Sequence, residues 1–446
     1  MSAANSDYRL KDKGQLPNAW KIAAGVSAVG LVLAGIGYGQ APERFGYSYL
    51  FGFFATLTVL FGAMFHVIAQ HVTQGHWSVS TRRIAEVLLT GAPVLAIFGF
   101  VLLGGVATGK FPMYREWLEA AEAAHHGGHH EAAAHHEEAP AAEEHAEGHS
   151  AYPIAPPHTP QMERLHDATL AKKVGFLNMT RWLVFGAIYI LIWLGLSWFY
   201  YTNSRKQDET KDKQLTIKMR SFAPGAAVLF GLSLTFAAFD WVMSLQPAWY
   251  STIFGVVIFG GSAVTIFALL VLFSSALFEG GHVGSAINVE HVHDHAKLMF
   301  GFMCFWTYVS FSQWMLIWYA GIPEEAVFFQ ARWTGGWEVI SKALPICHFA
   351  MPFVIFISRE VKRRLWAIKA VAVWLLFWHV VDIFWYVMPM STGHAPHFMV
   401  TAADVGCLLL VGGAFFAVVL KNIGQVPLVP SGDPRFDRSV HHHQSH

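Results

Sequence analysis

The sequence predicts an all-α polytopic membrane protein with ten transmembrane helices. Of its 446 residues, 54% are hydrophobic and only 13% are charged, which is about half the charged share of an ordinary soluble domain. Ten spans of about 20 apolar residues need roughly 200 residues, which this composition supplies. The composition argues against a soluble enzyme, a secreted disulfide scaffold and a disordered chain.

The ten predicted spans follow long apolar runs that are separated by polar segments. They cover residues 20–38, 48–72, 84–107, 177–201, 222–245, 252–278, 296–320, 338–358, 366–388 and 400–420. The first run is long enough to cross a membrane and ends without a clean cleavage site, so we interpret it as a span and not as a signal peptide.

These spans divide the chain into five segments. We expect a cytoplasmic N-terminal segment, helices 1–3, a periplasmic loop, helices 4–10 and a cytoplasmic tail, over residues 1–19, 20–107, 108–175, 176–420 and 421–446. Most of the 30 Lys and Arg residues fall on alternate loops, as in the pairs Arg82–Arg83 and Arg205–Lys206. Because basic residues favour the cytoplasmic side, we expect both termini there, in the bacterial cytoplasmic (inner) membrane.

Charge and cysteine content argue against several kinds of partner and site. Basic and acidic residues number 30 each, so the net charge does not indicate nucleic-acid binding. Cys304, Cys347 and Cys407 lie in apolar runs, and the chain has no C-x-x-C or C-x-x-C-H motif. We therefore expect no disulfide, zinc, iron–sulfur or c-type haem site in this chain.

The periplasmic loop contains a tract of His, Ala and Glu. Its histidines are His125, His126, His129, His130, His135, His136, His145 and His149. Tracts of this kind sometimes bind metal, but the spacing does not define a tetrahedral site. We interpret the loop as a solvated tether, which the prolines between residues 153 and 160 extend.

Two predicted helices end in similar patterns. Phe239–Ser244 ends the fifth helix and Val381–Met388 ends the ninth, and each has one Asp among aromatic residues near the predicted outer face. Because these helices are four apart, the pattern fits two four-helix bundles that arose by duplication. Two unrelated helices of similar composition would give the same pattern.

Ionisable residues inside spans are costly in a bilayer, so each is a candidate for function. We expect His66, Glu279, Asp294 and His295 near the inner face. Near the outer face we expect Asp240, His379, Asp382 and Asp404, and His348 lies between the two sets, flanked by Pro345 and Pro352. Two polar half-channels with a titratable group between them are typical of a proton path.

Three other interpretations of these residues stay open. Each polar side chain could simply hydrogen-bond a neighbouring helix, a stabilisation of about 0.6 kcal/mol. His66, His348 and His379 lie at depths that suit a b-type haem, although no strict paired spacing supports one. A quinone pocket needs a His or Asp beside an aromatic slot, and aromatic residues are too common here to be specific.

Two long stretches resemble a known family. They are Phe239–Gly255 (FDWVMSLQPAWYSTIFG) and Asp294–Glu325 (DHAKLMFGFMCFWTYVSFSQWMLIWYAGIPEE), and the basic end of the eighth helix, Ser358–Arg364, agrees with them. They resemble the membrane subunits of bacterial alternative complex III, in the NrfD/polysulfide-reductase membrane-anchor family, and most closely the ActF type. The resemblance spans residues 20–420. This sequence departs from the family pattern at Gln246 and Ala248, where the family leads us to expect an acidic residue and a His.

The resemblance implies two four-helix bundles flanked by two further helices, and no cofactor bound by this chain. It implies a quinol:cytochrome c oxidoreductase complex that uses menaquinol, with multihaem and monohaem cytochromes c, an iron–sulfur protein, lipids and a second ten-helix subunit as partners. The resemblance makes the sibling subunit the better candidate for the quinol site. For this chain we expect a proton path and, in addition, part of a quinone site, without catalysis by the chain alone. The alternatives are a stand-alone secondary transporter and a purely structural docking subunit.

Overall fold

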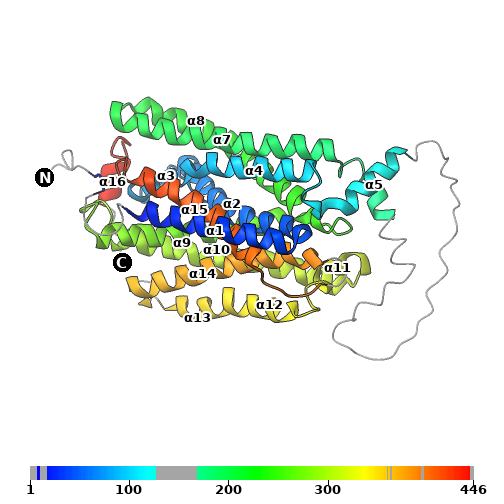
Figure 1. Cartoon of the computed structure of the whole chain (residues 1–446). Coiled ribbons are helices and arrows are strands. Elements are labelled where there is room, and N and C mark those ends of the chain that lie inside the picture. The colour runs from blue at the N-terminus through cyan, green and yellow to red at the C-terminus, as the bar shows by residue number, and fades with distance from the viewer. Residues whose placement is uncertain are drawn as a thin grey trace.

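The computed structural model describes residues 8–10, 18–126, 168–358, 360–361, 364–392 and 396–441. In this part of the chain, every regular element is a helix. The long helices lie side by side along one direction (Figure 1), with α16 at one end of the bundle and α5 and α11 at the other. We refer to these as the α16 end and the α11 end.

The helices have the following bounds. In chain order they are α1 (Ala19–Gln40), α2 (Pro42–Thr73), α3 (Val79–Leu88), α4 (Ala92–Ala107), α5 (Arg115–His126), α7 (Met179–Thr210), α8 (Lys213–Trp241), α9 (Phe254–Glu279), α10 (Val289–Ala320), α11 (Pro323–Gln330), α12 (Trp337–Leu344), α13 (Met351–Ile357), α14 (Leu365–Val387), α15 (Ala402–Ile423) and α16 (Phe436–Val440). A short 3-10 turn at Leu89–Gly91 joins α3 to α4.

Nine helical stretches within the described residues are long and apolar enough to cross a membrane. They are Ala19–Gln40, Pro42–Thr73, Val79–Ala107, Met179–Thr210, Lys213–Leu245, Phe254–Glu279, Trp337–Ile357, Leu365–Thr392 and Ala402–Ile423. The described part of the chain is therefore all-helical, and its nine long apolar helices indicate a multi-pass membrane protein.

The seventh predicted span, residues 296–320, differs from these nine. It forms part of α10, which has 32 residues and the length to cross a bilayer. It is less apolar than the nine because Trp306, Tyr308 and Gln313 dilute its aliphatic residues. Length alone would make α10 a span, and hydropathy alone would not.

Helix α2 lies at the centre of the bundle and packs against α8, α9 and α15, and α9 also contacts α10 and α14. Helices α1 and α15 form a closely packed pair beside α2. A methyl group on Gly37 would meet Ala403, and one on Gly406 would meet the backbone of Ala34. Small residues allow two membrane helices to approach this closely.

The predicted loop between the fourth and fifth spans, residues 202–221, is mostly helical, so its boundaries were wrong. Helix α7 continues to Thr210 and α8 begins at Lys213. The loop sequence has no Gly or Pro and contains four Lys, two Arg and two Gln, which favour helix without needing apolar periodicity. The chain reverses only at Lys211, whose φ of 56° is left-handed.

The prolines of the eighth predicted span interrupt its helix. Between α12 and α13, residues Pro345–Ala350 form a π-helical turn that contains His348. Proline removes a backbone donor and clashes with the preceding turn, and π-turns of this kind often occur at functional positions.

The predicted His-rich tether lies largely outside the described residues. Its N-terminal flank forms α5, and residues 168–173 form a further helical turn before α7. The predicted C-terminal tail, in contrast, is packed onto the α16 end from Gly424 to His441.

Candidate functional site

Two of the predicted residues, His66 and His295, meet near the α16 end. Their rings, on α2 and α10, lie 6.0 Å apart, and both side chains are buried. His295 Nε2 lies 2.8 Å from Oγ1 of Thr81 on α3. The Thr81 hydroxyl donates to the carbonyl of Ser78, so His295 Nε2 acts as the donor. His295 Nδ1 then has no protein partner among the described residues.

The same arrangement recurs near the middle of the bundle. His379 on α14 places Nε2 2.9 Å from Oγ1 of Thr58 on α2. The Thr58 hydroxyl donates to the carbonyl of Ala55, so His379 Nε2 is again the donor. His379 Nδ1 has no hydrogen-bond partner in the described part of the chain. Each histidine therefore keeps one buried nitrogen able to accept a proton.

Gly261 on α9 makes room for His379. A Cβ atom at position 261 would lie 2.6 Å from Cε1 and 2.8 Å from Nδ1 of the His379 ring. No substituent fits there without moving the ring.

We expect Gly261→Ala to push His379 away from Thr58 and to destabilise the protein by about 1–3 kcal/mol, as overpacking does. The midpoint of thermal unfolding in detergent measures this effect. Gly231→Ala on α8 is the matched control, because its Cβ would meet nothing within 4 Å and alanine favours helix. Equal stability of the two variants would contradict the close contact with His379.

His348 and Asp382 lie beside His379, around the indole of Trp306. The Trp306 and His348 rings lie 4.2 Å apart, and the indole Nε1 of Trp306 donates to Asp382 Oδ2 at 3.1 Å. All three side chains are buried. His379 and Asp382, one turn apart on α14, thus bond different helices, α2 and α10.

Asp240 and Asp404 form ion pairs with arginine, apart from these histidines. Arg181 binds Asp240 with both terminal nitrogens at 3.0 Å, and the Tyr189 hydroxyl donates to the same carboxylate. Arg44 holds both oxygens of Asp404, at 3.1 and 3.0 Å, beside a cavity of about 220 Å³. Such complete pairing is typical of structural carboxylates.

Glu279 and Asp294 also pair with cations, nearer the surface. Glu279 accepts two hydrogen bonds from Lys369 at 2.8 Å, and Asp294 lies 2.6 Å from the amine of Lys297. Both lysines are partly exposed. The nine predicted residues therefore fall into one pair (His66 with His295), one triad (His348, His379 and Asp382) and four separate ion pairs.

A buried ion network at the α16 end was not predicted. Arg82 binds Glu86 at 2.7 Å and Asp433 at 2.8 Å, and Arg83 binds Glu86 at 3.1 Å and also Asp208. Burial raises the pKa of Asp433, but the charges of Arg82 and Arg435 outweigh this and hold the pKa below its usual range. Glu86 lies inside a predicted span, four residues after Arg82, and that spacing was the available signal.

Arg332, between α11 and α12, is a second buried charge that sequence reasoning missed. Its guanidinium donates to the carbonyls of Phe328 at 2.7 Å, Trp385 at 3.0 Å and Tyr386 at 2.8 Å. Burial lowers its pKa to about 9, so it remains a cation at neutral pH. Its weakest contact is to Oε1 of Gln246, at 3.4 Å.

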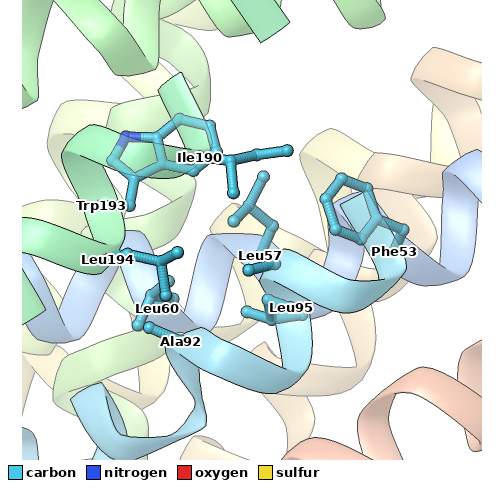
Figure 2. Close-up of a pocket in the computed structure, with 9 residues that line it drawn as sticks. Phe53, Leu57, Leu60, Ala92, Leu95, Ile190, Trp193 and Leu194 are labelled. Carbon is cyan, nitrogen blue, oxygen red and sulfur yellow. The ribbon is translucent and has the colours of Figure 1, made fainter. Parts of the chain in front are cut away.

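A small apolar cavity lies inside the bundle, apart from these clusters. This cavity of about 10 Å³ between α2, α4 and α7 is lined by Leu57, Leu95, Trp193 and other apolar side chains (Figure 2). It holds at most one water-sized probe, so it offers no room for a quinone ring. Within the described residues, no group of three or more His, Cys, Asp or Glu side chains could hold a metal ion.

The chain matches no known protein-family model, and no curated protein is significantly similar to it in sequence.

Proposed function

We propose that the chain is a proton-conducting membrane subunit of a respiratory quinol:cytochrome c oxidoreductase of the alternative complex III type. The observation that carries this proposal is the repeated histidine–threonine arrangement. His295 and His379 each donate from Nε2 to a threonine and keep a buried Nδ1 as an acceptor. A histidine that donates at one nitrogen and accepts at the other can relay protons.

The proposed route runs along α2 and α14. From the α16 end it passes His295 and His66, then His379, and then Asp382 beside Trp306. Thr58 and His66 are eight residues apart on α2, which corresponds to about 12 Å along the helix axis. This gap is too long for one direct proton transfer, so the route needs water or intermediate groups between the two clusters.

Two buried hydroxyls lie on α9 between the residues that contact the two clusters. On α9, Ser262 and Thr265 lie between Gly261, which faces His379, and Phe267, whose ring contacts His66. Both hydroxyls donate to carbonyls of their own helix, at 2.8 and 2.9 Å. Their oxygens retain acceptor capacity for a water chain.

We further propose that α10 also crosses the membrane, which brings the nine candidate spans to ten. The packing supports one bundle of α2, α3–α4, α7 and α8, a second of α9, α10, α12–α13 and α14, and a flanking pair of α1 and α15. The buried face of α10 fits this role, since His295, Met299 and Trp306 all face the protein interior. In the bacterial inner membrane, the α16 end would face the cytoplasm, in agreement with the basic loops.

The proposed complex rests on the resemblance of Phe239–Gly255 and Asp294–Glu325 to this family. It has cytochromes c, an iron–sulfur protein, a sibling ten-helix subunit and menaquinol as partners. Where the family leads us to expect an acidic residue, Gln246 offers Arg332 a neutral oxygen. By the same resemblance, we assign the quinol site to the sibling subunit.

Purification through this chain in mild detergent tests the complex directly. We expect co-elution of cytochromes c and an iron–sulfur protein, seen as c-type haem bands in a reduced-minus-oxidised spectrum. A colourless protein that elutes alone would overturn the proposal. It would favour a stand-alone secondary transporter, for which the interrupted helix at Pro345–Ala350 is also typical.

A further inference from the structure

The C-terminal segment, residues 424–441, is built into the α16 end of the protein. Val426, Val429 and Phe436 are buried there. The backbone of Leu428 donates to the carbonyl of Tyr8 at 2.8 Å, and the Tyr8 ring packs edge-on against Phe436. This amount of packing distinguishes the segment from a solvated tail.

Ser439, Asp433 and Gly432 attach the segment to three helices, α3, α10 and α7. The Ser439 hydroxyl accepts hydrogen bonds from the backbone and the hydroxyl of Ser80 on α3, at 3.0 and 2.9 Å. Its backbone carbonyl lies 3.1 Å from Nε2 of His291 on α10. Asp433 binds Arg82, and the backbone of Gly432 donates to Asp208 at 3.1 Å.

The segment lies over the histidine cluster at the α16 end. Ser80, which bonds Ser439, is the neighbour of Thr81, which bonds His295. Beneath these contacts, the buried atoms His66 Nε2, His295 Nδ1 and both nitrogens of His71 have no hydrogen-bond partner in the described residues. Buried polar atoms of this kind readily take up water when it can reach them.

The ion pairs allow the segment to leave without stranding a charge. Asp433 also binds Arg435 of the same segment at 2.9 Å, so it would keep a cation after release. Arg82 would keep Glu86, and Arg83 would keep Glu86 and Asp208. An isolated buried charge is the main cost of breaking a buried ion pair. Since every charged group here keeps an oppositely charged partner, Asp433 can separate from Arg82 without that cost.

We propose that residues 424–441 form a gate that closes the α16 end of the His66–His295 cluster, with Asp433 and Ser439 as its latch. In the closed state, the segment separates the cluster from solvent. In the open state, water reaches Thr81 and His295. The role of the gate in proton transfer rests on the proposed function, whereas the closure itself does not.

The closure is tested by thiol labelling of Ser80→Cys with a membrane-impermeant reagent, measured against the parent chain with its three native cysteines. Ser80 is fully buried beneath Ser439. We expect slow labelling in the closed protein and at least tenfold faster labelling when Asp433→Asn is added. Asp437→Asn, which removes an exposed charge from the same segment, is the matched control.

A second test does not depend on the folding of Asp433→Asn. It uses a protease site inserted between the exposed residues Gly424 and Gln425. The chain is cut after folding, and labelling is compared before and after the cut. Unchanged labelling in both the cut chain and the Asp433→Asn variant would overturn the gate.

Proton release by the complex then separates the gate from the proposed function. Faster labelling with altered proton release supports the gate. Suppose that proton release by the complex depends on Asp382 and that opening the segment speeds thiol labelling but leaves proton release unaltered. This result would overturn the gating role and leave the proposed proton route intact. If release does not depend on Asp382 either, the proposed function fails, and the gating role fails with it.

Discussion

Asp382→Asn is expected to remove proton translocation by the assembled complex while leaving quinol oxidation largely intact. Asparagine has nearly the same volume and its carbonyl oxygen can still accept from the indole of Trp306. It cannot bind or release a proton at neutral pH. Protons released per electron, measured in proteoliposomes during quinol oxidation, should fall to the value that quinol oxidation alone gives.

Ser233→Ala is the matched control for this variant. Ser233 on α8 accepts from the indole of Trp193 at 2.9 Å, so it also holds a buried tryptophan but lies outside the proposed route. We expect normal proton release from the control. Normal release from Asp382→Asn as well would exclude Asp382 from the route, and a wild-type complex that translocates no protons would leave the route without a function.

The helices were largely predictable from the sequence because a bilayer imposes long apolar runs. The fifth span illustrates both the success and its limit. Its apolar part was recognised, but α8 begins at Lys213, nine residues before the predicted start at 222. Charged residues that favour helix extend it beyond the hydrophobic region, and hydropathy contains no signal for that extension.

The pairing of side chains was not predictable, because it depends on contacts between distant segments. Asp404 was expected to line a proton path, yet it is held by Arg44, 360 residues earlier in the chain. The rule that ionisable groups in membrane spans are candidates for function selects Asp404, which is in an ion pair, and Asp382, which is not, equally. Only the partner, an arginine for Asp404 and an indole for Asp382, distinguishes them.

Glu86→Gln is expected to destabilise the protein by about 3–5 kcal/mol, the usual cost of breaking a buried ion pair from one side. Glu86 is fully buried and is shared by Arg82 and Arg83. Glutamine can still accept a hydrogen bond, for example from Ser204, which now donates to Glu86 at 2.7 Å. It cannot neutralise two buried guanidinium groups, so the α16 end of α3 should lose its packing against α7.

The thermal unfolding midpoint and the yield of folded protein in detergent measure this loss. Glu279→Gln is the control, because its pair with Lys369 is partly exposed and such pairs contribute only about 0–1 kcal/mol. If both variants unfolded at the wild-type temperature, Asp433 and Asp208 would be sufficient to neutralise the two arginines. In that case Arg82 would depend on Asp433 alone, and release of the C-terminal segment would strand a buried charge.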